Sequence, residues 1–223
     1  MKKLFIIANW KSNKTIKEAE EWIRKFKEEF ERESFDISSK EIIICPSFTV
    51  LKSFSDSIKS LNFFLKIGAQ DISSFDQGAY TGEVNGLQIK ESADYVIVGH
   101  SERRTNFNES SELISKKADM ARRYGIVPIF CVQDETTPIP DKIAIVAYEP
   151  PSAIGTGKPD TPENAEEVAK KIKEENKAQF VLYGGSVTSE NVKLFSAMQN
   201  IDGFLIGGAS LDPSEFLQII KNA

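Results

Sequence analysis

One histidine, His100, directly follows the apolar run 95–99, and it is the only histidine in the chain. Imidazole is the side chain whose ordinary pKa lies nearest neutral pH, so His100 is a candidate for proton chemistry. A histidine at the end of a strand can also be a hydrogen-bonded structural residue, and its own position does not decide between the two.

Two further residues at strand ends carry charges that could serve a reaction. Glu149 ends the apolar run 143–148, where partial removal from water would suit a general base. An acid at a helix cap or in a surface ion pair is the alternative for Glu149. Lys11 closes the motif Asn9-Trp10-Lys11 after the first apolar run, and it could supply fixed positive charge.

Glycines after the last two apolar runs indicate a site for an anion. Gly184 and Gly185 precede Ser186, and Gly207 is followed by Gly208. A glycine lets backbone N–H groups approach a phosphate closely, and barrel enzymes commonly bind phosphate after strands seven and eight. Tight turns that need glycine conformations would give the same sequence.

These residues need elements to position them, and the chain alternates short apolar runs with amphipathic charged stretches. Eight runs that are almost continuously apolar are typical of parallel strands covered on both faces. They are residues 4–9, 41–45, 63–69, 95–99, 127–132, 143–148, 180–183 and 204–206. Helix starts are predicted at Thr15, Thr161 and Asp212 from capping residues. The pattern predicts an α/β fold, a (β/α)8 barrel, in one domain over residues 1–223.

One crossover is too short for the usual barrel unit. Residues 133–142 separate the fifth and sixth predicted strands and include Pro138 and Pro140. A parallel crossover normally takes a dozen or more residues and a helix, and the prolines leave no room for one. We therefore predict that the helix between strands five and six is deleted.

Composition excludes several classes of function. The net charge of −5 argues against a non-specific nucleic-acid or membrane binder, and no apolar run is long enough for a membrane helix. The amino terminus lacks a signal-peptide pattern. Cys45 and Cys131 lie in apolar runs without metal-ligand spacing, so we expect them to be reduced and buried in a cytoplasmic protein.

Six segments in order along the chain closely resemble the triosephosphate isomerase family. They are residues 8–11, 78–83, 98–104, 147–158 (apart from 151–152), 183–187 and 203–209. The resemblance implies a TIM barrel and an aldose–ketose isomerase of glycolysis and gluconeogenesis. Its substrates would be D-glyceraldehyde 3-phosphate and dihydroxyacetone phosphate, interconverted through an enediolate without metal or organic cofactor.

The resemblance also implies a role for each matching residue. Glu149 would be the proton-transfer base, His100 a neutral electrophile and Lys11 the electrostatic stabiliser; a base and a neutral histidine are the known pairing of this family. By the same analogy, the pKa of His100 would be lowered by the helix start at residues 101–103 and by Lys11. Substrate would be bound by Asn9, Lys11, Gly155, Ser186, Gly207 and Gly208, with Glu102 and Tyr183 supporting them. Residues 150–158 would form a lid.

The segment 70–86 corresponds to the family loop that inserts into a second subunit. The resemblance therefore implies a homodimer, with Phe75 and Tyr80 as contacts, although both could instead pack within their own loop.

The chain departs from the family pattern at two places. Pro151-Ser152 stands where the family usually has a hydrophobic residue and tryptophan, which should weaken packing of the lid hinge. The helix after strand five is missing, which predicts retained activity with reduced stability or compensation by neighbouring helices.

Other functions fit the sequence less well. A different phosphate-handling barrel, such as an aldolase or sugar-phosphate isomerase, would explain the glycines but not His100 and Glu149 with this lid. A non-catalytic scaffold would be expected to lack the base, the lysine or the histidine. Barrels host many chemistries, so the fold alone decides nothing.

Overall fold

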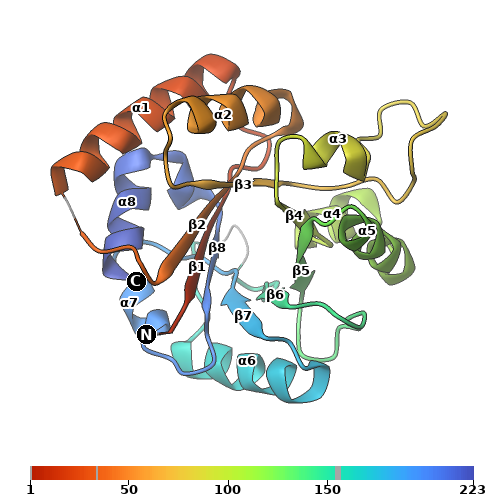
Figure 1. Cartoon of the computed structure of the whole chain (residues 1–223). Helices are drawn as coiled ribbons and strands as arrows, with labels where there is room; N and C mark the ends of the chain where they lie inside the picture. Colours follow the sequence, from red (N-terminus) through yellow and green to blue (C-terminus); the bar gives the residue numbers. More distant parts are fainter. Residues whose placement is uncertain (1, 34, 154–156) are drawn as a thin grey trace.

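The computed structural model describes residues 2–33, 35–153 and 157–223. Eight parallel strands close into a barrel in the order β1 to β8, and helices surround it (Figure 1). The strands are β1 Leu4–Asn9, β2 Lys40–Cys45, β3 Lys66–Ala69, β4 Tyr95–Val98, β5 Val127–Val132, β6 Ile145–Tyr148, β7 Phe180–Tyr183 and β8 Gly203–Ile206. The predicted α/β barrel is confirmed.

Three of the helices, α1, α6 and α8, begin where the sequence predicts caps. They are α1 Ile16–Glu33, α2 Phe48–Ser60, α3 Gly86–Lys90, α4 Ser101–Phe107, α5 Ser111–Arg123, α6 Pro162–Asn176, α7 Val192–Ser196 and α8 Pro213–Asn222, with a short 3-10 helix η1 at Gly208–Leu211. Thr161 and Asp212 cap α6 and α8 by accepting backbone N–H groups, and Thr15 and Glu18 form the predicted reciprocal pair before α1.

The barrel interior and the layer under the helices form two separate apolar clusters. Side chains alternate along each strand, so on β1 Phe5 and Ile7 face inward while Ile6 and Ala8 face the helices. The free thiols of Cys45 and Cys131 both lie in the interior cluster, buried as expected. Because the period is two, Asn9 continues the inward series of β1, and Glu149 continues that of β6 beyond Ala147. The strand pattern thus directs both side chains into the mouth of the barrel.

The connection from β5 to β6 contains no helix, and the structure describes all of residues 133–144. In Figure 1 this connection runs along the outside of the barrel as an irregular loop. Its turns are held by Asp134, whose carboxylate accepts hydrogen bonds from Thr136 and Thr137. The predicted deletion is confirmed.

Neighbouring helices contact this shortened connection. Arg122 of α5 donates to the carbonyl of Asp141 at 3.0 Å, and Lys171 of α6 pairs with Glu135 at 3.2 Å. These contacts, with Ile139 packed against the core, hold the connection against the barrel.

Candidate active site

Residues from five strand ends, those of β1, β4, β6, β7 and β8, meet at one cavity of about 270 Å³ at the carboxyl end of the barrel. Asn9, Lys11, His100 and Glu149 line one side of it. The glycine-rich turns after β7 and β8 line the other, with Gly184, Gly185, Ser186, Gly207 and Gly208. The structure therefore brings together the residues that the sequence placed at separate strand ends.

Glu149 is the most deeply buried acid at this cavity, with 1% of its surface exposed. One carboxylate oxygen accepts the backbone N–H of Ser101 at 2.8 Å, and the other lies 2.9 Å from Nε2 of His100. The backbone N–H of Glu149 donates to the carbonyl of Val132, which fixes the base of the side chain against β5. The carboxylate is thus held by two donors.

The turn after β7 leaves room for Glu149 because it carries no side chain there. A Cβ added at Gly184 would lie 2.9 Å from Cγ of Glu149 and 3.2 Å from the carbonyl oxygen of Tyr148. The glycine therefore serves close packing beside the carboxylate, in addition to the turn.

His100 caps the first turn of α4. Its Nδ1 accepts the backbone N–H of Glu102 at 3.1 Å, which requires an unprotonated Nδ1. Nε2 then carries the hydrogen and donates to Glu149. This hydrogen-bonding pattern is that of a neutral imidazole with its one donor directed at the cavity.

The pKa of His100 is nevertheless raised in this arrangement, not lowered as predicted. Burial lowers it and Lys11 lowers it further, but the charge and hydrogen bond of Glu149, together with the charge of Glu102, raise it more. The prediction considered only the helix start and Lys11, and it omitted a carboxylate in contact with Nε2. It is wrong for the arrangement that the structure describes.

Lys11 lines the cavity, and its own backbone is in the left-handed conformation, with φ of 53°. Its backbone N–H donates to Oδ1 of Asn9 at 3.1 Å, and its carbonyl accepts from Nε2 of Gln70 at 2.9 Å. Its ammonium lies 2.5 Å from Glu102, the partner that the sequence analysis expected. A Cβ at Gly207 would lie 3.2 Å from Cε of Lys11, so this glycine also makes space for the lysine.

Gln70 was not predicted as a site residue. Its amide also donates to the carbonyl of Cys45, and so it ties the turn bearing Lys11 to the end of β2. Its position directly after β3 was the one sequence signal that it could belong to the site. Its contacts could not be predicted, because they depend on how the ends of β1, β2 and β3 meet.

The segment after Glu149 is described on both sides of residues 154–156. Gly155, predicted to bind substrate, and the centre of the predicted lid 150–158 lie outside the described residues. Ser186 donates through Oγ to the carbonyl of Ala153 at 2.8 Å, and Tyr183 accepts the backbone N–H of Asp160 at 2.7 Å. The end of β7 and the turn after it therefore contact this segment on both sides of residues 154–156.

Among the described residues, no group of three or more histidine, cysteine, aspartate or glutamate side chains is arranged to hold a metal ion. None of the described helices combines the length and apolar character needed to span a membrane.

Comparison with known proteins gives one consistent result. The family model described as triosephosphate isomerase matches residues 4–223. Proteins named triosephosphate isomerase are 41% identical in Mesomycoplasma hyopneumoniae strain 232, over the full length of both chains, and 37% identical in Dictyoglomus turgidum, also over both full lengths. The protein of that name from Aquifex aeolicus is 42% identical over 96% of this chain and 97% of its own.

Proposed function

The chain belongs to the triosephosphate isomerase family, and from this premise we propose how its own residues carry out the family's reaction. It is an intramolecular isomerase of glycolysis that interconverts D-glyceraldehyde 3-phosphate and dihydroxyacetone phosphate. The assignment of roles is supported chiefly by one observation. Glu149 and His100 contact each other at the cavity that Lys11 and the glycine-rich turns complete.

Glu149 acts as the base. When substrate enters, its carboxylate turns from His100 and Ser101 toward the substrate and removes a proton from the carbon beside the carbonyl. The electron pair moves onto the carbonyl oxygen and gives an enediolate. The hydroxyl proton of the enediolate passes to the oxygen that carried the charge, and Glu149 returns its proton to the neighbouring carbon, which yields the isomeric triose phosphate.

His100 and Lys11 stabilise the oxygen on which charge develops. Nε2–H of His100 donates a hydrogen bond to that oxygen, and the ammonium of Lys11 supplies positive charge to it and to the phosphate. Asn9 orients Lys11 and the substrate oxygens. Glu102 holds Lys11 until the substrate phosphate competes for it.

The phosphate dianion lies against the turns after β7 and β8. Backbone N–H groups at Ser186, Gly207 and Gly208, and at Gly155 of the lid, would bind it. Tyr183 supports the lid from β7. The chemistry requires only proton transfers and charge stabilisation, so we expect no metal or organic cofactor to take part.

We further propose that residues 1–223 form a single domain that works as a cytoplasmic homodimer, in gluconeogenesis as well as glycolysis. The dimer is supported by the loop 70–86, which projects from the barrel in Figure 1. Phe75 and Tyr80 stack there with ring centroids 4.1 Å apart, while both remain close to half exposed. The buried, free cysteines support a reducing compartment.

A coupled isomerase assay on the wild type and on Glu149→Gln tests the central role. Removing the base should lower kcat by about 10²–10⁴-fold, the usual contribution of a positioned proton-transfer group. Glu135→Gln, which changes an acid on the β5–β6 connection, serves as the matched control and should retain wild-type turnover. An inactive wild type would refute the function, and a fully active Glu149→Gln would refute the assigned base.

A further inference from the structure

Asp160 lies at the carboxyl end of the segment 150–160, which follows Glu149, and it makes several hydrogen bonds there. It precedes Thr161, the cap of α6, and it is half-buried. One carboxylate oxygen accepts the backbone N–H of Thr161 at 2.8 Å; the other accepts the amide of Asn164 at 2.6 Å and the hydroxyl of Tyr148 at 3.3 Å. The backbone N–H of Asp160 donates to the hydroxyl of Tyr183. A single residue thus contacts α6 and the ends of two neighbouring strands.

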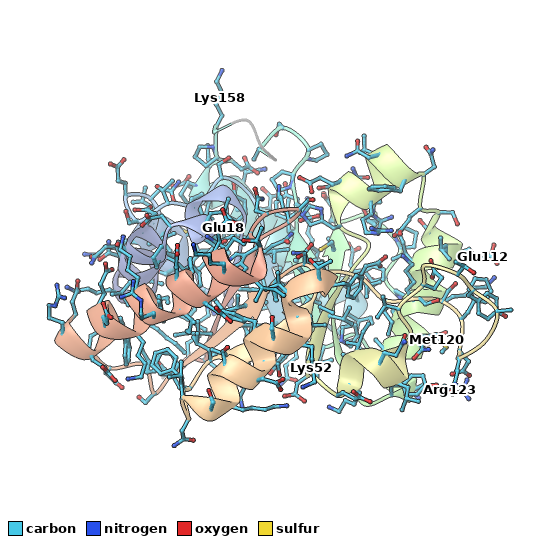
Figure 2. The ribbon with its side chains drawn as sticks, turned by 90° about the horizontal axis from the view of Figure 1, so that it is seen from above. Glu18, Lys52, Glu112, Met120, Arg123 and Lys158 are labelled. Carbon is cyan, nitrogen blue, oxygen red and sulfur yellow. The ribbon has the colours of Figure 1, made fainter. Side chains whose placement is uncertain are left out.

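The two tyrosines are fixed partners for Asp160. Tyr148 ends β6 and Tyr183 ends β7, where they pair in the strand register, and both rings are buried. Tyr183 also stacks on Phe195 with centroids 4.3 Å apart. Lys158, two residues before Asp160, projects away from the body of the molecule (Figure 2). Asp160 itself contacts both tyrosines.

The charge of Asp160 suits this position. A carboxylate just before the first turn of α6 interacts favourably with the positive end of the helix dipole. Burial raises the pKa of Tyr148, and the nearby charge and hydrogen bond of Asp160 raise it further. The phenol therefore stays protonated and remains a hydrogen-bond donor to the carboxylate.

The contact with Tyr148 matters because Tyr148 is bonded directly to Glu149. The carbonyl of Tyr148 already accepts the backbone N–H of Gly184 at 2.7 Å. Its hydroxyl is held by Asp160 as well, so Tyr148 is fixed through both its main chain and its side chain. The carboxylate of Asp160 links the end of the segment 150–160 back to the residue before its beginning.

We propose that Asp160 is a positioning residue for the isomerisation: through the hydroxyl of Tyr148 its carboxylate fixes the end of β6 and keeps the adjoining Glu149 aligned with the substrate. This inference rests on the proposed role of Glu149 as the base. It assigns to a carboxylate and a phenol the support of a strand end next to Pro151-Ser152, where the bulky aromatic side chain of the family pattern is missing.

The fate of the enediolate distinguishes alignment from simple stability. If Glu149 returns the proton slowly, the enediolate persists and can eliminate phosphate. In that reaction the electron pair of the enediolate forms a new carbon–carbon double bond, and the C–O bond to phosphate breaks with its pair leaving on phosphate. The remaining enol becomes a ketoaldehyde. Inorganic phosphate released per isomerisation therefore reports how well the base is aligned.

The test compares Asp160→Ala, Asp160→Asn and Tyr148→Phe with the wild type, measuring kcat, KM and phosphate released per turnover. Asp160→Ala should lower kcat about tenfold, since small misplacements of a catalytic group have effects of this size, and should raise the phosphate yield by a similar factor. Asp160→Asn keeps an acceptor oxygen, so its kcat and its phosphate yield should both lie close to the wild-type values. Tyr148→Phe should reproduce the alanine phenotype, and the double variant should be no worse than the poorer single variant.

Thr161→Ala is the structural control, because it removes the cap of α6 and leaves Asp160 in place. It should lower the melting temperature without changing the phosphate yield. Wild-type kinetics in Asp160→Ala would overturn the inference, as would equal losses in Asp160→Ala and Thr161→Ala at an unchanged phosphate yield. Should Asp160→Ala fail to fold, wild-type kinetics in Tyr148→Phe would overturn it. If Glu149→Gln is inactive while Asp160→Ala behaves as wild type, this inference alone fails.

Discussion

At the scale of single residues, the carboxylate of Glu149 controls the charge of its neighbour as well as its own chemistry. In the substrate-free arrangement its contact with Nε2 raises the pKa of His100. In the proposed reaction Glu149 turns toward substrate, and that contact is lost. Burial and Lys11 then lower the pKa against the remaining charge of Glu102, and the N–H of Glu102 continues to require an unprotonated Nδ1. One side-chain rotation would therefore deliver the base and leave His100 a neutral hydrogen-bond donor.

The sequence predicted which residues meet at the site better than it predicted their electrostatics. Asn9 and Glu149 follow strands whose inward positions recur every second residue, so their meeting at the barrel mouth could be inferred. The pKa direction of His100 depends on one rotamer of Glu149, which no pattern encodes. Asp160 could not be identified either, because its significance comes from two hydroxyls on separate strands.

At the scale of elements, the helix-free connection 133–144 shows how a barrel unit can be shortened. Pro138 and Pro140 exclude a helix, and the loop is held by Asp134 and by contacts from α5 and α6. The deletion lies outside the barrel wall and away from the cavity. The absence of a helix from this connection was predictable from its length and its prolines. The contacts from α5 and α6 were not predictable, because they depend on the tertiary arrangement.

Replacement of Ile139 tests whether this connection substitutes for a packed helix. Ile139 is half-buried against the core, so Ile139→Ala should lower the free energy of unfolding by about 1–2 kcal/mol, less than for a fully buried isoleucine. Turnover should stay at the wild-type level. Chemical denaturation measures the change, and Leu194→Ala on the exposed face of α7 should alter stability by less than about 0.5 kcal/mol. Equal stability of the two variants would show that the connection contributes no packing.

At the scale of the whole molecule, the closed parallel barrel followed from eight apolar runs and their capped helices. The family motifs, spread almost from end to end of the chain, identified the function. Association is the feature that a single chain defines least. A second hollow of about 190 Å³ lies beside Lys11, with the exposed Phe107 in its lining. A partner's loop would have apolar surface to cover there.

Sedimentation analysis tests the proposed homodimer. The wild type should sediment as a dimer at micromolar concentration. Phe75→Glu should shift it toward monomer, because a charge would have to be buried within the loop 70–86 contact. Leu194→Glu introduces the same charge on exposed α7 and should remain dimeric. A monomeric wild type, or a Phe75→Glu variant that stays dimeric, would contradict the assignment of this loop to the interface.

The link between Glu149 and His100 is the centre of the account, and the single histidine makes it directly measurable. An NMR titration of the His100 imidazole in the substrate-free wild type and in Glu149→Gln isolates the effect of one charge. We predict a pKa above the ordinary value of 6.5 in the wild type and a clearly lower pKa in Glu149→Gln, where burial and Lys11 are opposed by Glu102 alone. The same pKa in both proteins would contradict the account.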